Sequence, residues 1–112
     1  MIEMATFEVM AGEAERFEAV FGAVGRLLAS SRGHAGHRLL RDMNDCGRFV
    51  LIVDWRDGGG GAASFRDSGR LAQVRALLEP FHRLSPSLTF FSDVDTAADT
   101  AGLSPWKSHC AD

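Results

Sequence analysis

The sequence contains no tyrosine and, among its 112 residues, only two cysteines and three prolines. Cys46 and Cys110 are far apart, and Cys110 belongs to a polar C-terminal segment, so we do not expect a disulfide framework. No stretch approaches the roughly 20 apolar residues that a membrane-spanning helix requires. The N-terminus also lacks the basic region and the apolar run of a secretory signal. We therefore predict a cytoplasmic protein that does not bind membranes.

The chain also lacks a strong charge excess, with a formal net charge of −3 and a calculated pI near 5.7. Its arginines are scattered among acidic residues, whereas nucleic-acid-binding proteins usually carry a clear basic excess. We therefore predict no nucleic-acid partner. The composition, 46% hydrophobic and 24% charged, is typical of a single folded domain. Because a chain of this length buries only about two-thirds of its unfolded surface, a partner subunit would enlarge a modest core.

Loosely alternating apolar residues at positions 1–10 predict a first strand that is covered on both faces. Gly12 ends this strand, and the acidic Glu13 and Glu15 favour the first turn of a helix because of the helix dipole. Apolar residues at steps of three and four predict that the helix continues to about residues 30–33. The resulting stripe consists of Ala14, Phe17, Val20, Phe21, Val24, Leu27 and Leu28.

The centre of the sequence predicts a β-hairpin. Residues 37–43 are expected to form the second strand, and the polar segment 44–47 is typical of a hairpin turn. The unbroken β-prone run within residues 48–55 predicts the strongest strand of the protein. Four consecutive glycines at positions 58–61 follow this strand, and their conformational freedom predicts a mobile loop.

A second helical region follows the glycines, and we expect it to be interrupted at residues 68–69. Its latter part places apolar residues on one face. These residues are Leu71, Val74, Leu77, Leu78 and Phe81. Pro80 and Pro86 mark the exit from the helix, so residues 87–94 are predicted to form the last strand.

The predicted order of elements, strand–helix–strand–strand–helix–strand, indicates an α+β protein with a ferredoxin-like fold. Two right-handed crossovers in this order give a four-stranded antiparallel sheet with both helices on one face. The other face is too apolar to remain exposed to water, so we predict a homodimer. Residues 1–94 form the predicted domain. Residues 95–112 have no apolar period and are expected to be a tail, either flexible or docked on the partner subunit.

Several segments of the domain are similar to those of one known family. They are Gly12 before the first helix, residues 33–38, the run at 49–55 and residues 64–68. Together they resemble the antibiotic biosynthesis monooxygenase domain over about residues 1–94. Members of this family are dimeric α/β barrels with a pocket between the sheet and the helices of each subunit. Some oxidise phenolic or anthrone-type polyketide intermediates to quinones with molecular oxygen. The resemblance therefore implies a homodimeric monooxygenase for a small aromatic substrate, with no cofactor and no metal.

The same resemblance implies two catalytic residues, and the sequence itself offers a third. Quinone-forming members combine a tryptophan on the strand with an arginine about twenty positions later, and here these residues are Trp55 and Arg75. The indole can meet a ligand oxygen, and the guanidinium can hold a phenolate. His37, at the start of the second predicted strand, is the predicted general base. Leu51 and Gly61 occupy the positions at which those members carry an asparagine and a tyrosine.

Apolar side chains are expected to form the walls of the substrate pocket, as is common in small-molecule sites. The predicted substrate-binding residues are Phe7, Leu51, Phe65 and Val74. His34 and His82 resemble His37 but are less well placed as bases. The four histidines do not have the spacing of metal ligands, so no metal site is predicted.

Other interpretations remain open at this stage. Because Leu51 and Gly61 replace polar residues, the fold could instead serve a non-oxidative isomerase or cyclase, or bind a small aromatic ligand. A further alternative is a dimer whose pocket is filled by its own phenylalanines. Trp55 could equally be a core residue without a ligand, and Arg75 could be an exposed helix arginine.

Overall fold

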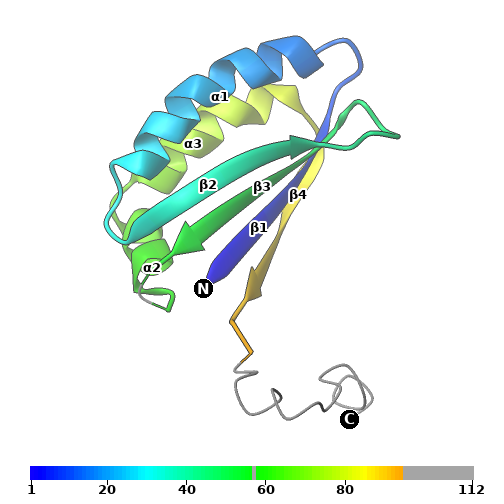
Figure 1. The fold of residues 1–112 in the computed structure, drawn as a ribbon. Coiled ribbons are helices and arrows are strands. Elements are labelled where there is room, and N and C mark those ends of the chain that lie inside the picture. Colours follow the sequence, from blue (N-terminus) through cyan, green and yellow to red (C-terminus); the bar gives the residue numbers. More distant parts are fainter. Residues whose placement is uncertain (57, 95–112) are drawn as a thin grey trace, which may run out of the picture.

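The computed structural model describes residues 1–56 and 58–94, so the predicted tail at 95–112 lies outside the described residues. The elements follow the predicted order, with the second helical region divided in two (Figure 1). They are β1 (Ile2–Val9), α1 (Ala14–Ala29), β2 (His34–Arg41), β3 (Arg48–Trp55), α2 (Gly60–Asp67), α3 (Arg70–Leu78), the 3-10 helix η1 (Glu79–Phe81) and β4 (His82–Phe91). None of the helices in this described part is long and apolar enough to cross a membrane.

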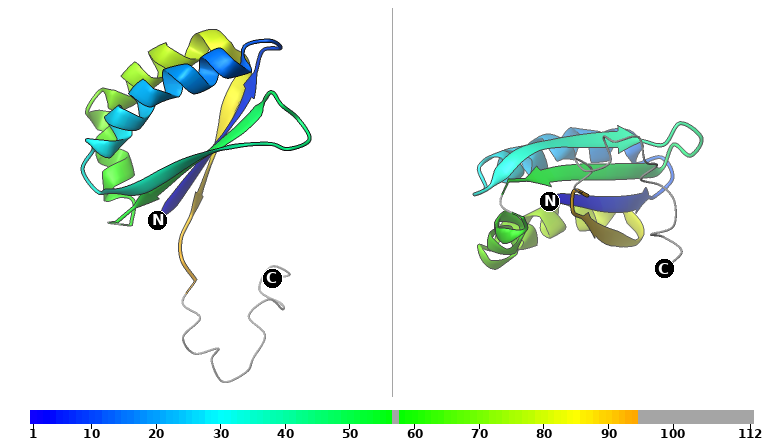
Figure 2. Two further views of the ribbon diagram at one scale, coloured as in Figure 1. Left: turned by 45° about the horizontal axis from the view of Figure 1, so that its top comes forward. Right: turned by 60° about the horizontal axis from the view of Figure 1, so that its bottom comes forward.

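The four strands form one sheet in the order β2-β3-β1-β4, and every neighbouring pair is antiparallel. Helices α1 and α3 lie side by side over the same face of this sheet (Figures 1 and 2). This arrangement confirms the predicted ferredoxin-like α+β fold. It leaves the opposite face of the sheet without helices, and it places the core between the helices and the sheet.

The two central strands alternate between the two faces of the sheet. On β3, Phe49, Leu51, Val53 and Trp55 are buried beneath the helices, and the residues between them are more exposed. This period of two is what a strand requires when one face packs on a core. The β3 run also ends at Trp55, as the sequence predicts.

Helix α1 is held on the sheet by the predicted apolar stripe. Phe17 and Val24 are completely buried, and Phe21 and Leu28 are nearly so. The ring centroid of Phe17 lies 4.8 Å from that of Phe49 on β3, so the helix and the central strand share an aromatic contact. The remaining stripe positions are partly buried, as expected at the margin of an amphipathic helix.

The predicted interruption of the second helical region is confirmed at Gly69, which separates α2 from α3. Gly69 has a φ of +84°, a left-handed conformation that glycine adopts without steric cost. The turn allows α3 to run in a new direction and to bury Val74 and Leu78 against the sheet. Phe81, in η1, completes this buried face.

Two strand boundaries differ from the prediction. Strand β2 spans His34–Arg41 instead of residues 37–43, and the Asp42 carboxylate accepts bonds from the backbone of the turn that follows. Strand β4 begins at His82, five residues before the predicted start. Pro86 does not end the strand, because a register shift there places Ser85 and Pro86 against one residue of β1. Proline is tolerated at such bulges and on edge strands.

Candidate functional site

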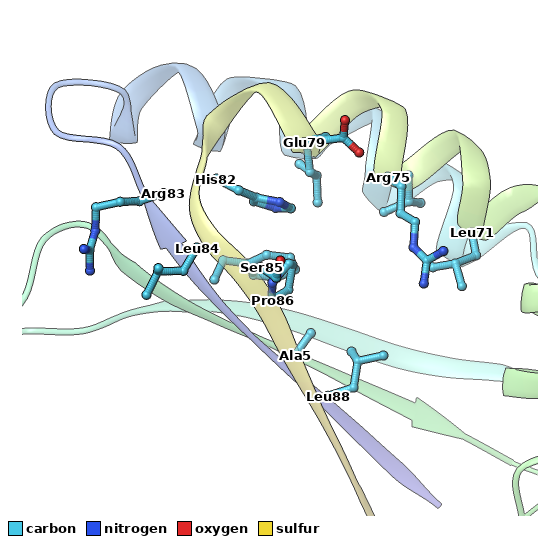
Figure 3. Close-up of a pocket in the computed structure, with 13 residues that line it drawn as sticks. Ala5, Leu71, Arg75, Glu79, His82, Arg83, Leu84, Ser85, Pro86 and Leu88 are labelled. Atoms are coloured by element: carbon cyan, nitrogen blue, oxygen red, sulfur yellow. The ribbon is translucent and has the colours of Figure 1, made fainter.

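A cavity of about 660 Å³ lies between α3 and the sheet, at the side of the molecule formed by β1 and β4 (Figure 3). This volume is within the range of about 300–1,000 Å³ that is common for small-molecule sites. The residues that line it are Ala5, Phe7, Leu71, Val74, Arg75, Leu78, Glu79, His82, Arg83, Leu84, Ser85, Pro86 and Leu88.

The walls of the cavity are mainly apolar. Phe7 projects from β1 on the helix-facing side, and Val74 and Leu78 project from α3 toward the sheet; all three are buried. Leu88 on β4 is 47% exposed and lines the cavity from the edge of the sheet. The cavity is therefore closed by the core on one side and reaches the surface near the β4 edge.

Charged side chains lie among these apolar walls. Arg75 extends from α3 into the space between the helix and β4 (Figure 3). Within residues 1–56 and 58–94, the Arg75 guanidinium makes no ion pair and no hydrogen bond. Arg83 differs, because its Nη2 lies 3.5 Å from Oε1 of Glu8 on β1. Arg75 is thus the cation at this cavity that can hold an anionic group of a ligand by charge-assisted hydrogen bonds.

His82 provides a second polar group. Its ring stacks on the ring of Phe7, with centroids 5.6 Å apart and an interplanar angle of 24°. Its Nε2 atom is buried and has no hydrogen-bond partner among the described residues. Burial lowers the pKa of His82, and the carboxylate of Glu79 opposes this effect in part. The imidazole is therefore neutral near pH 7, the state in which a histidine can accept a proton.

The structure brings together three of the residues that the sequence predicts for the site. Arg75, Phe7 and Val74 all line the cavity. The other predicted residues, Trp55, His37, Leu51 and Phe65, are not among its lining residues. Their roles in catalysis or substrate binding remain predictions.

Trp55 lies at the opposite end of the sheet from His82. The residue is 1% exposed, and its Nε1–H donates a hydrogen bond of 2.9 Å to Oε1 of Glu3. Its ring centroid is 5.9 Å from that of Phe65, which is also buried. The polar atom of the indole thus has a protein partner, and its apolar part is covered by the core.

His37 is in the same region, on the edge strand β2. Its Nδ1 lies 2.9 Å from Nε2 of His34, so the two rings share a hydrogen bond. Burial lowers the pKa of His34, and the nearby His37 and Arg56 act in the same direction, whereas Asp54 raises it. The histidine pair is thus already engaged within the protein.

The sequence gives little signal for the position of His82. Its place in the cavity follows from the pairing of β1 with β4, which sets His82 opposite Val9 and its ring over Phe7. His82 is the first residue of β4, but the sequence does not reveal this. Pro86 interrupts the β pattern, so the predicted strand starts after His82.

A family model for the antibiotic biosynthesis monooxygenases matches residues 1–80. Since this match covers well over half of the chain, the protein belongs to the antibiotic biosynthesis monooxygenase family. The resemblance inferred from the sequence is thereby confirmed.

Similar proteins agree with this assignment. The chain is 26% identical over 92 residues to YczJ of Bacillus subtilis, a protein of uncharacterized activity, and the match covers 82% of this chain and 97% of YczJ. A Bordetella bronchiseptica structure assigned to the same family has a TM-score of 0.76 and 27% identity, covering 83% of this chain and 95% of that one. SnoaB from Streptomyces nogalater, a cofactor-independent oxygenase, has a TM-score of 0.63 and 20% identity, covering 83% and 94% of the two chains. At that identity, the likeness to SnoaB concerns the fold alone.

Proposed function

We propose that this protein is a cofactor-independent monooxygenase that oxidises a polycyclic phenolic or anthrone-type substrate to a quinone with molecular oxygen. The observation that supports it most directly is the apolar cavity of about 660 Å³ with the unpaired Arg75 at its wall, in a member of the monooxygenase family. A planar aromatic body fits apolar walls, and a phenolate oxygen fits a guanidinium.

This oxidation requires the protein only to bind the substrate and to stabilise its negative charge. In an anthrone, the reacting CH₂ carbon becomes the second carbonyl of the quinone. One oxygen atom of O₂ enters that carbonyl, and the other leaves as water with the two hydrogens of the carbon. The ionised substrate is electron-rich and reduces O₂ directly. In this scheme Arg75 stabilises the substrate anion, while Phe7, Val74 and Leu78 exclude water around it.

The test measures oxygen uptake and quinone absorbance together, in metal-free and flavin-free protein supplied with anthrones and naphthols. Loss of a hydrogen bond to a charged group costs about 1.5–3 kcal/mol, so Arg75→Ala is expected to slow oxidation about tenfold or more. Arg70→Ala is the matched control, because Arg70 is on the same helix but does not line the cavity. Methyl ethers of the naphthols, which cannot ionise, should not react.

A specific observation also favours a second candidate, a non-oxidative isomerase, cyclase or aromatic-ligand binder. Leu51 and Gly61, which replace the polar residues of quinone-forming relatives, are both buried. If folded protein consumes no oxygen with any of these compounds, the oxidation is refuted. A rise in melting temperature with the same compounds would then favour the second candidate.

We further propose that the protein acts as a homodimer through the sheet face that carries no helices. Met4 and Ile52 are register partners on the two central strands, and they are half-exposed on this face together with their neighbours Ile2 and Val50. Apolar area removed from water contributes roughly 25 cal/mol per Å², so a second copy would stabilise this face.

Ile52→Glu places a charge in the middle of that face and is expected to convert the dimer to a monomer, as measured by light scattering. Arg66→Glu is the control, because it changes an exposed residue of α2 on the helical side. A wild-type protein that is monomeric at every concentration tested would contradict the dimer.

A further inference from the structure

The side chain of His82 is held in a fixed position beside the cavity. It is the first residue of β4, directly after η1, and its ring is stacked on Phe7 of the neighbouring strand β1. Figure 3 shows the His82 ring extending from β4 into the space below α3, the same space that Arg75 enters from above. Side chains held by a strand and an aromatic contact keep the geometry that catalysis requires.

The hydrogen-bonding state of His82 is unusual for a buried polar group. Its Nε2 has no partner among the described residues, although the great majority of buried polar side-chain atoms in proteins have one. The contrast is with His34 and His37, whose ring nitrogens bond to each other. Nε2 itself is buried beside the cavity that His82 lines, so a ligand there can become its partner after a small rotation of the ring that brings the nitrogen to the cavity surface.

Burial favours a neutral His82 imidazole that can take up a proton, and the nearby carboxylate of Glu79 opposes this effect only in part. Arg75 lines the cavity from α3, Glu79 from η1 and Arg83 from β4. The Arg83 guanidinium is directed away from the space that His82 and Arg75 enter, toward Glu8 of β1. Burial keeps the pKa of His82 below its ordinary value. A neutral histidine near a cation is suited to removing a proton whose departure leaves an anion beside that cation.

We propose that His82 is a further catalytic residue, the proton acceptor for an acidic hydroxyl of the aromatic substrate, and that Arg75 holds the oxyanion that results. This inference rests on the proposed function, because it concerns the same cavity and the same substrate class. The O–H bond of the hydroxyl breaks, its electron pair stays on oxygen, and an N–H bond forms on the imidazole. No electrons leave the substrate in this step. For an anthrone this hydroxyl is that of the enol tautomer, whose proton came from the CH₂ carbon. The proton that the imidazolium returns is therefore one of the two that leave with the reduced oxygen as water.

The alternative is that His82 only provides a flat ring to cover Phe7. His82→Phe separates the two roles, since phenylalanine can keep the stacking but cannot accept a proton. His82→Gln is the second variant, in case the first does not fold.

The experiment is a spectrophotometric titration of bound 2-hydroxyanthraquinone, a probe that is already a quinone and whose phenolate absorbs at longer wavelength than its phenol. On the wild-type protein, the bound probe should ionise at a lower pH than the free probe. His82→Phe and His82→Gln should raise this midpoint by about one pH unit, the usual size of an environmental shift. Arg70→Ala should leave it unchanged.

A variant that binds the probe with the wild-type midpoint would overturn the role of His82. The readout needs neither oxygen nor turnover, so it is independent of the proposed oxidation. A shifted midpoint in a protein that oxidises none of the anthrones or naphthols would support His82 as proton acceptor and refute the oxygenase. A wild-type protein that does not bind the probe at all would overturn the role of His82 as well.

Discussion

The two ends of the layer between the helices and the sheet differ in how their polar groups find partners. At the Trp55 end, the indole N–H is bonded to Glu3, and the amino group of Met1 donates to the carbonyl oxygen of Trp55 at 2.9 Å. At the cavity end, Nε2 of His82 has no hydrogen-bond partner and Arg75 has no ion pair within the described residues.

This difference separates residues that stabilise the fold from residues that are available to a ligand. A polar group whose partner is in the protein must lose that partner before it can bind anything else. A group without a partner gains one when the ligand arrives. The comparison therefore supports the proposed site at the cavity end, and it leads us to expect that the Trp55 end contributes mainly to stability.

The largest expected effect is on stability at the Trp55 end. Trp55→Ala removes a residue that is 1% exposed, and such changes in a core typically cost about 3–5 kcal/mol. Arg75→Ala changes an exposed residue without an ion pair in the described part of the chain, so it should alter the free energy of unfolding by less than about 0.5 kcal/mol. Urea denaturation of both variants measures the contrast.

Trp55→Phe is the companion to this comparison. It keeps most of the apolar packing but removes the donor to Glu3, and a half-buried acceptor left without its partner costs about 1–3 kcal/mol. If Trp55→Ala were no more destabilising than Arg75→Ala, the division of the molecule into a stabilising end and a binding end would be wrong.

The same two ends show what the sequence can predict. The run that ends at Trp55 predicts β3 correctly, because β-prone residues in an unbroken series form a central strand in almost any context. The stripe of α1 is equally local, since steps of three and four along the chain determine which face is buried. Arg75 was also predicted for the site, through its resemblance to the family, and it lines the cavity.

The position of His82, the proposed proton acceptor, depends on contacts between residues far apart in the sequence. His37 lies in the middle of β2 and His82 is the first residue of β4, so both belong to strands and local pattern does not tell which one reaches the cavity. What distinguishes them is pairing: the neighbour of His37 is His34, whereas the β1–β4 register places His82 over Phe7 beside the cavity. The bulge at Pro86, which a sequence pattern reads as the end of a segment, is part of the same arrangement.

The smallest expected effect is a pH dependence that both ends share. Burial is the main cause of the lowered pKa of His34 and of His82. The folded protein therefore binds fewer protons than the unfolded chain between these lowered pKa values and the ordinary value of about 6.5. Stability should be fully present above about pH 6.5 and should fall as the pH decreases through that window.

Single variants show how much of this loss of stability each histidine causes. The midpoint of urea unfolding is measured for each variant from pH 7.5 down to about pH 5. His34→Gln and His82→Gln should each make the loss of stability on acidification smaller. Because the contacts of His34 are with His37 and Trp55 while those of His82 are with Phe7, residues without shared partners should give additive effects in the double variant. If the change in the free energy of unfolding of the double variant differs from the sum of the single changes by more than about 0.5 kcal/mol, the two ends are coupled. Protonation at the histidine pair would then influence the cavity.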